Sequence, residues 1–170
     1  MTIAEGFLIE FDEEMKKTRR MLERVPDAVL DYKPHPKSMS MRELASHIAD
    51  MPGWGAVTVE SDELDLQPPE GPAYEVYLGE SSDGILGFFD RNVIKAKSAI
   101  SPVSNEEMLA DWTLLMHTKP IFTMPRIGVL KSMTLNHIIH HRAQLGVYLR
   151  MNDVPIPGMY GPSADDLEAG

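Results

Sequence analysis

The chain has 170 residues, no cysteine and a formal net charge of −10 at pH 7. The lack of cysteine excludes disulfides, thiolate metal sites and a cysteine nucleophile, and the acidic balance argues against a nucleic-acid partner, which requires a surface of Lys and Arg. The hydrophobic content of 43% predicts a single globular domain over residues 1–170. The acidic N-terminus and the absence of a long apolar run predict a cytoplasmic protein with no secretory signal and no membrane span.

Residues 3 to 24 have the pattern of an amphipathic helix that ends at Pro26. Apolar residues recur at steps of three and four, which places them on one face: Phe7, Leu8, Phe11, Met15, Thr18, Leu22 and Val25. The charged residues between them, which include Glu13, Glu14, Lys16 and Lys17, are predicted to form a solvated face without a functional site.

A capping box at Ser40–Glu43 predicts a second helix that starts at Met41 and runs to residues 57–59. Pro52 is expected to kink this helix or to end its regular part. His47 lies on the apolar face, where a lone histidine is usually a hydrogen-bonded core residue. If a metal site exists, His47 becomes a candidate ligand. Asp50, one turn further on, then becomes a candidate for orienting it, and otherwise reads as a surface acid.

The middle of the chain has weaker signals. Residues 60–80 are acidic and then proline-rich, so we expect a loop that either covers the mouth of a site or crosses the surface in solvent. Residues 82–101 predict a third helix with its N-cap at Ser81 or Ser82, and Ser104–Glu107 forms another capping box that opens one or two turns. Residues 112–124 are expected to be irregular or briefly extended, with His117 in a turn rather than in a site.

The strongest chemical signal lies in a fourth predicted helix, residues 128–152, whose apolar stripe includes His137 and His141. These two histidines are four residues apart, so their side chains can converge on one point, as the two helical ligands of a zinc site do. Imidazole is a common ligand for such metals. The same spacing also arises by chance. From the spacing alone, these histidines could instead be hydrogen-bonded or exposed residues that bind no metal. After this helix, residues 154–163 are expected to be non-helical and to pack on the bundle, and residues 165–170 to fray.

Four long amphipathic helices and no convincing strand pattern predict an all-α fold. We expect a four-helix bundle with long crossover connections and an irregular C-terminal tail.

Two groups of residues carry a family resemblance. The first is Tyr32–Pro34 followed by Glu43–Ala49, and the second is Asn136–His137 with His141–Gln144 and the tail Val154–Ser163. In these stretches the chain resembles the DinB-like (damage-inducible) proteins, and the resemblance covers most of its length. The chain departs from the pattern at Ala143, where the family's His-Arg-Gly-Gln run has a glycine.

The resemblance implies a four-helix bundle, often a homodimer, in which His47, His137 and His141 hold a divalent metal. Zinc or nickel is expected first, with manganese or iron as alternatives, because three nitrogens discriminate poorly among these ions. His140 lies about 100° around the helix from His141 and should point to a flank. Arg142 points away from the histidine face, toward a dimer partner or a carboxylate.

An open position on such a metal implies a small-molecule substrate. The resemblance implies an S-transferase that uses a low-molecular-weight thiol. The alternatives are a metal-dependent hydrolase and a non-catalytic metal-binding stress or interaction module. Asp50 and Tyr160 are the candidate catalytic residues for proton transfer.

Overall fold

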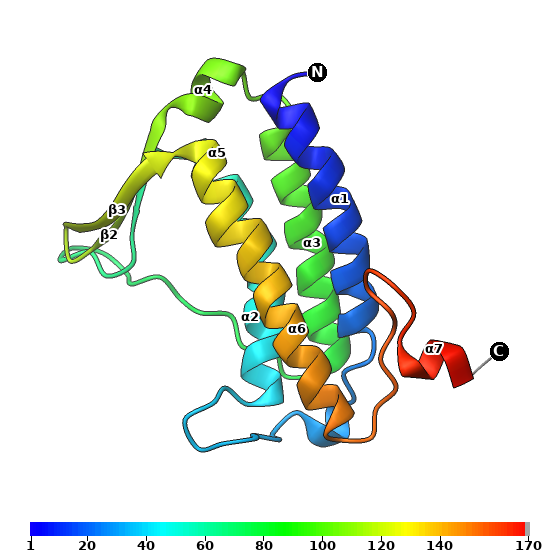
Figure 1. Ribbon diagram of the computed structural model, residues 1–170. Helices are drawn as coiled ribbons and strands as arrows, with labels where there is room; N and C mark the ends of the chain where they lie inside the picture. Colours follow the sequence, from blue (N-terminus) through cyan, green and yellow to red (C-terminus); the bar gives the residue numbers. More distant parts are fainter. Residues whose placement is uncertain (169–170) are drawn as a thin grey trace.

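The computed structural model describes residues 1–168 and is mainly helical (Figure 1). Four helical columns lie side by side: α1 (Ile3–Leu22), α2 (Met41–Glu60), α3 (Ser82–Ile100) and a composite fourth column of α5 (Arg126–Val129), the π-helical segment η2 (Leu130–Asn136) and α6 (His137–Arg150). Short helical pieces stand outside the columns: η1 (Asp27–Val29), α4 (Asn105–Leu109) and α7 (Ala164–Glu168). None of the helices among residues 1–168 combines the length and the apolar composition that a membrane span requires.

The helix starts follow the capping signals of the sequence. The Ser40 hydroxyl accepts from the Glu43 backbone N–H while the Glu43 carboxylate accepts from the Ser40 N–H, and Ser104 and Glu107 repeat the arrangement at α4. These bonds satisfy N–H groups that the first turn of a helix leaves unpaired. Ser81 caps α3. The apolar stripes then pack into one core that includes Phe11, Ile48, Phe89, Leu130 and Leu145, all buried.

Helix α2 continues through Pro52 and ends at Glu60, so Pro52 does not terminate the regular helix. Proline has no N–H to donate to the carbonyl four residues earlier and normally destabilises a helix interior. Pro52 is itself buried, as are Met51 and Trp54 beside it. Packing on neighbouring columns therefore holds the helix together across the missing hydrogen bond.

The fold is mainly helical but not all-α, and residues 112–124, expected to be irregular or briefly extended, form most of a hairpin. A three-stranded sheet, in the order β1-β2-β3, consists of β1 (Glu63–Asp65), β2 (Asp111–Met116) and β3 (Lys119–Pro125). β2 and β3 form an antiparallel hairpin, and β1 pairs in parallel with β2. Trp112 and Leu114 anchor β2 in the core. The strand β1 has only three residues and pairs with residues about fifty positions away. A local sequence pattern therefore does not predict it.

The fourth column has the predicted extent, but its buried face differs from the predicted stripe. In the π-helical segment η2 each turn holds more residues than in an α-helix, and this changes which residues face inward after it. The buried residues of α6 are Ile138, Arg142, Leu145, Gly146 and Leu149. His137 and His141 therefore lie half-buried at the edge of the core instead of in its middle.

Residues 66–81, between β1 and α3, have no regular structure, but side chains tie them down. Arg42 donates to the Gly79 and Glu80 carbonyls, and the Tyr77 and Phe88 rings stack with centroids 3.7 Å apart. Tyr74 in this loop also reaches α2, through Asp50. The loop thus packs along the second and third columns.

The tail after α6 is non-helical and packs back on the columns, as predicted, with Pro157 buried. Part of its end is better ordered than expected, because Ala164–Glu168 forms the helix α7. Asp165 pairs with Arg150 and accepts from the Ile156 N–H, and these contacts lower the pKa of Asp165 to about 2. The remaining part of the predicted frayed end, residues 169–170, lies outside the described residues.

Candidate metal centre

Three histidines from two columns meet at one point. His47 lies in α2, and His137 and His141 lie one turn apart in α6. The Nε2 atoms of His47 and His137 are 3.4 Å apart, and those of His137 and His141 are 2.8 Å apart. One ligand atom from each histidine lies within 4.8 Å of the other two. Ninety residues of chain separate His47 from His137, so helix packing creates this cluster.

The cluster fits a divalent metal ion. Two metal–nitrogen bonds of about 2.0–2.1 Å place their nitrogens at most about 4.2 Å apart. Two of the three separations, 3.4 Å for His47–His137 and 2.8 Å for His137–His141, fall within this limit, and all three ligand atoms lie within 4.8 Å of one another. Among residues 1–168 the cluster contains no carboxylate and no fourth histidine. The three imidazoles could therefore hold one divalent ion and leave coordination positions open.

A neighbouring amide orients one of the three rings. His141 Nδ1 lies 2.8 Å from Gln144 Oε1, so Nδ1–H donates to the amide oxygen and Nε2 keeps its lone pair. The Gln144 amide nitrogen in turn contacts His140 Nε2 at 3.2 Å. The backbone of Met133 lies near the His137 ring and acts on its pKa in the raising direction, against the effect of burial. His140 itself is exposed and outside the cluster, on the flank where it was predicted.

The surroundings keep the cluster in its metal-binding protonation state. Burial, with a smaller effect from the neighbouring histidines, lowers the pKa of His47 to about 4. Burial likewise lowers the pKa values of His137 and His141, although the Gln144 contact partly opposes this at His141. Imidazoles that are neutral at pH 7 have lone pairs available for a metal, so no proton has to leave before binding.

Asp50 has a different partner from the one predicted. Its carboxylate accepts a 2.5 Å hydrogen bond from the Tyr74 hydroxyl, which itself accepts from Trp54 Nε1 at 2.9 Å. Among the described residues no hydrogen bond joins Asp50 to His47. Asp50 is 8% exposed, and burial raises the pKa of its carboxyl, although the Tyr74 bond acts in the opposite direction.

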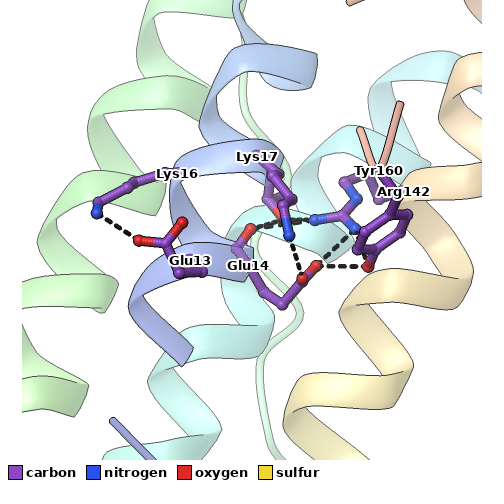
Figure 2. A network of polar contacts seen from close by, with 7 residues as sticks. Glu13, Glu14, Lys16, Lys17, Arg142 and Tyr160 are labelled. Carbon is purple, nitrogen blue, oxygen red and sulfur yellow. Dashed lines mark hydrogen bonds and ion pairs between the residues drawn. The ribbon is translucent and has the colours of Figure 1, made fainter. Parts of the chain in front are cut away.

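Tyr160, an exposed residue of the C-terminal tail, takes part in an ionic network with Glu14 of α1 and Arg142 of α6, which are buried (Figure 2). Its hydroxyl donates to Glu14 at 2.7 Å and accepts from Arg142 at 2.8 Å, and Arg142 pairs with Glu14 at 2.6 Å. Lys17 binds the other oxygen of Glu14 at 2.7 Å. Burial alone raises the pKa of Glu14, but the bonds from Lys17, Tyr160 and Arg142 outweigh it and leave the pKa lowered.

The prediction that Glu14 is solvated is therefore wrong, since its side chain is only 8% exposed. Glu14 follows Phe7 and Phe11 at steps of four and three, which places it on the apolar stripe. This position was the signal that could have identified it. Arg142 points away from the histidines to a carboxylate, one of its two predicted destinations.

Fold and site together define a helical protein with a three-histidine cluster of the kind that holds a divalent metal. Residues 10–145, which include all three histidines, match the family model of the DinB superfamily. The chain therefore belongs to the DinB superfamily, as its motifs indicated. No match was found among proteins with curated descriptions.

Solved structures of DinB-like proteins share the fold. One from Bacillus cereus ATCC 10987 is 23% identical with a TM-score of 0.68, covering 92% of this chain and 97% of its own. The DinB-like protein YjoA from Bacillus subtilis is 17% identical with a TM-score of 0.65, and the match covers 95% of this chain and 99% of YjoA. A protein from Exiguobacterium sibiricum 255-15, assigned to the DinB family, is 14% identical with a TM-score of 0.59, and the match covers 90% of this chain and 93% of the other. Identities this low establish the fold alone.

Proposed function

We propose that the protein binds one divalent metal ion through the Nε2 atoms of His47, His137 and His141, inside a four-helix bundle formed by its helical columns. The observation that carries the proposal is the convergence of these three atoms from α2 and α6. The three donors are neutral nitrogens, a set that suits zinc or nickel best and also accepts manganese or iron.

We further propose that the reaction is the transfer of a low-molecular-weight thiol to a small electrophile. A divalent ion held by neutral ligands keeps its full charge, and as a Lewis acid it would favour the anionic form of a thiol at an open position. The chain has no cysteine, so the thiol has to come from a second substrate.

Of the two candidate catalytic residues, Asp50 is the better placed to accept the thiol proton. It lies three residues from His47, hence on a neighbouring part of the same helix face. Tyr74 occupies its Oδ2 atom, which leaves Oδ1 available, and burial raises the pKa of its carboxyl toward the range where it can take up a proton. The Tyr160 hydroxyl is committed to Glu14 and Arg142.

The main alternative is a metal-binding module without turnover. It is favoured by the hydrogen bond between Asp50 and Tyr74, because this contact occupies one oxygen of the candidate proton acceptor. A metal-dependent hydrolase remains the second alternative, since the same Lewis acid also activates water.

Metal content tests the first step. Wild type, His137→Ala and the matched control His140→Ala are purified in parallel and analysed by plasma mass spectrometry. We expect about one metal per chain in wild type and in the control, and a strong loss in His137→Ala. Equal, substoichiometric metal in all three proteins would reject the metal site.

A thiol-transfer screen tests the second step with protein shown to be fully metal-loaded. We expect turnover that requires both thiol and metal and that falls about 100-fold or more in Asp50→Asn. Turnover of ester or amide substrates without thiol would favour the hydrolase, and no turnover at full metal occupancy would favour the non-catalytic module.

The assembly is also part of the proposal. We expect a homodimer, and sedimentation velocity checks it directly. A species with the 19.0 kDa mass of one chain at micromolar concentration would contradict it.

A further inference from the structure

A second candidate binding site lies where the C-terminal tail passes over α6. It is a groove of about 380 Å³, within the size range of small-molecule sites. Its lining is mostly apolar and includes Met21, Ile139, Val147, Ile156, Pro157 and Met159. In Figure 1 the tail runs back beside α1 and α6, which form the other walls.

The groove faces away from the histidine cluster. Successive residues of an α-helix are about 100° apart, so Gly146 lies about 180° around α6 from His137 and Ile139 about 200°. Both line the groove, and neither His137 nor His141 does. A ligand in the groove would therefore be separated from the metal centre by the body of α6.

Arg142 is the one charged residue among the described residues that line the groove. Its side chain is only 2% exposed, and four of its five N–H groups are occupied. Nη1 donates to the Glu14 carbonyl and the Thr18 hydroxyl, and Nη2 donates to the Glu14 carboxylate and the Tyr160 hydroxyl. The N–H on Nε has no acceptor within residues 1–168, which makes it the group available to a ligand.

The charges around Arg142 favour an anionic ligand. Lys17 and Arg142 supply two positive charges and Glu14 one negative charge (Figure 2). Lys17 also lies over the Tyr160 ring, with its Nζ 4.4 Å from the ring centroid. On the tail side of the groove, the Asp166 carboxylate accepts from the Gly158 and Ser163 N–H groups, and Arg20 acts on it as the opposite charge. The Lys17–Glu14–Arg142 group has a net charge of +1 in a chain whose total charge is −10. One monoanion would neutralise it.

We propose that this groove binds a medium-chain alkyl monocarboxylate. The carboxylate accepts from Arg142 Nε, and the alkyl chain lies against the apolar wall formed by Ile139, Val147 and Ile156. The site is independent of the proposed metal function.

Isothermal titration with decanoate tests this, using full-length protein in EDTA so that no metal can hold the carboxylate. We expect saturable binding of one decanoate per chain, and at least about tenfold weaker binding of decylamine, which has the same chain and the opposite charge. This comparison uses wild-type protein and needs no variant.

Two variants locate the site. Val147→Glu adds a competing negative charge at an exposed position of the lining and should weaken decanoate binding about tenfold or more. Ile94→Glu makes the same change at an exposed position of α3 outside the groove and should leave binding unchanged. His137→Ala should also bind decanoate normally.

Absence of saturable binding, equal affinity for decanoate and decylamine, or equal effects of the two glutamate substitutions would overturn the proposal. Loss of decanoate binding in His137→Ala would overturn it as well, because that result would place the ligand at the histidine cluster. Circular dichroism of each variant confirms that the helical fold is retained.

Discussion

At the scale of single residues, the histidine cluster and the Glu14–Arg142 pair differ in their charge when buried. The histidine cluster brings together three groups that prefer to be neutral, because burial lowers the pKa of each. The Glu14–Arg142 pair instead stays charged in the core, because Tyr160, Lys17 and Thr18 complete its hydrogen bonds. Breaking the second cluster leaves a buried charge, whereas breaking the first does not.

The low pKa of His47 makes the stability of the metal-free protein depend on pH. Between pH 6.5 and about 4 the unfolded chain binds a proton at His47 that the folded chain does not, so stability falls as pH drops through this window. We expect the melting temperature in EDTA to fall between pH 7 and pH 5, and to fall less in His47→Asn. His117→Asn, which changes an exposed turn histidine, should behave as wild type.

Glu14 and Glu13 form a matched pair for testing the buried ion pair (Figure 2). Glu14→Gln should reduce the free energy of unfolding by about 3–5 kcal/mol, because it leaves the buried Arg142 guanidinium without its counter-charge. Glu13→Gln removes an exposed contact with Lys16 and should cost less than about 0.5 kcal/mol. Urea unfolding of both variants measures the difference, and similar losses would contradict the argument.

At the scale of elements, the β2–β3 hairpin has an unusual turn. Its turn residues His117 and Thr118 have φ angles of 52° and 63°, in the left-handed region. The Asp65 carboxylate, at the end of β1, accepts from both of their backbone N–H groups, at 3.1 and 2.7 Å. A contact from a distant strand thus holds a turn that its own residues disfavour.

Replacing Thr118 should therefore stabilise the protein. A branched side chain is strained at positive φ and glycine is not, so Thr118→Gly is expected to raise the free energy of unfolding by about 0.5–1 kcal/mol. The control is Thr123→Gly in β3, where the Thr113–Thr123 hydroxyl contact is lost and glycine weakens the strand. Thr123→Gly should lower the free energy of unfolding in the same urea titration. A higher free energy of unfolding in Thr123→Gly, or a lower one in Thr118→Gly, would contradict the claim that Thr118 is strained.

At the scale of the whole molecule, the histidine cluster joins α2 to the fourth column. An ion bound there would link residues 47 and 141 across the core and would bind only the folded chain. Metal binding and global stability are therefore expected to be coupled.

This coupling gives a measurement that does not depend on activity. A metal at 100 times its dissociation constant should stabilise the wild type by about 2.7 kcal/mol, seen as a higher melting temperature that EDTA reverses. His141→Ala should show no such shift, and His140→Ala should respond as wild type. A chelator-insensitive melting temperature in metal-loaded wild type would contradict the coupling.

The sequence by itself determined where the four long helical segments run. Apolar steps of three and four and the Ser40 and Ser104 capping boxes are local signals, and each depends on residues within a few positions of one another. The four-residue spacing of His137 and His141 was likewise sufficient to predict that they share a helix face.

Only the tertiary structure decided which of these faces meet. The burial of Glu14, the pairing of β1 with β2 and the choice of Tyr74 as the partner of Asp50 all depend on residues far apart in the chain. Arg142 is among the buried residues of α6, which follows a π-helical segment that changes which residues face inward. The free energy of a charged group or of a strand pairing depends on the residues that pack against it. Those residues are distant in the chain, so a local sequence pattern does not identify them.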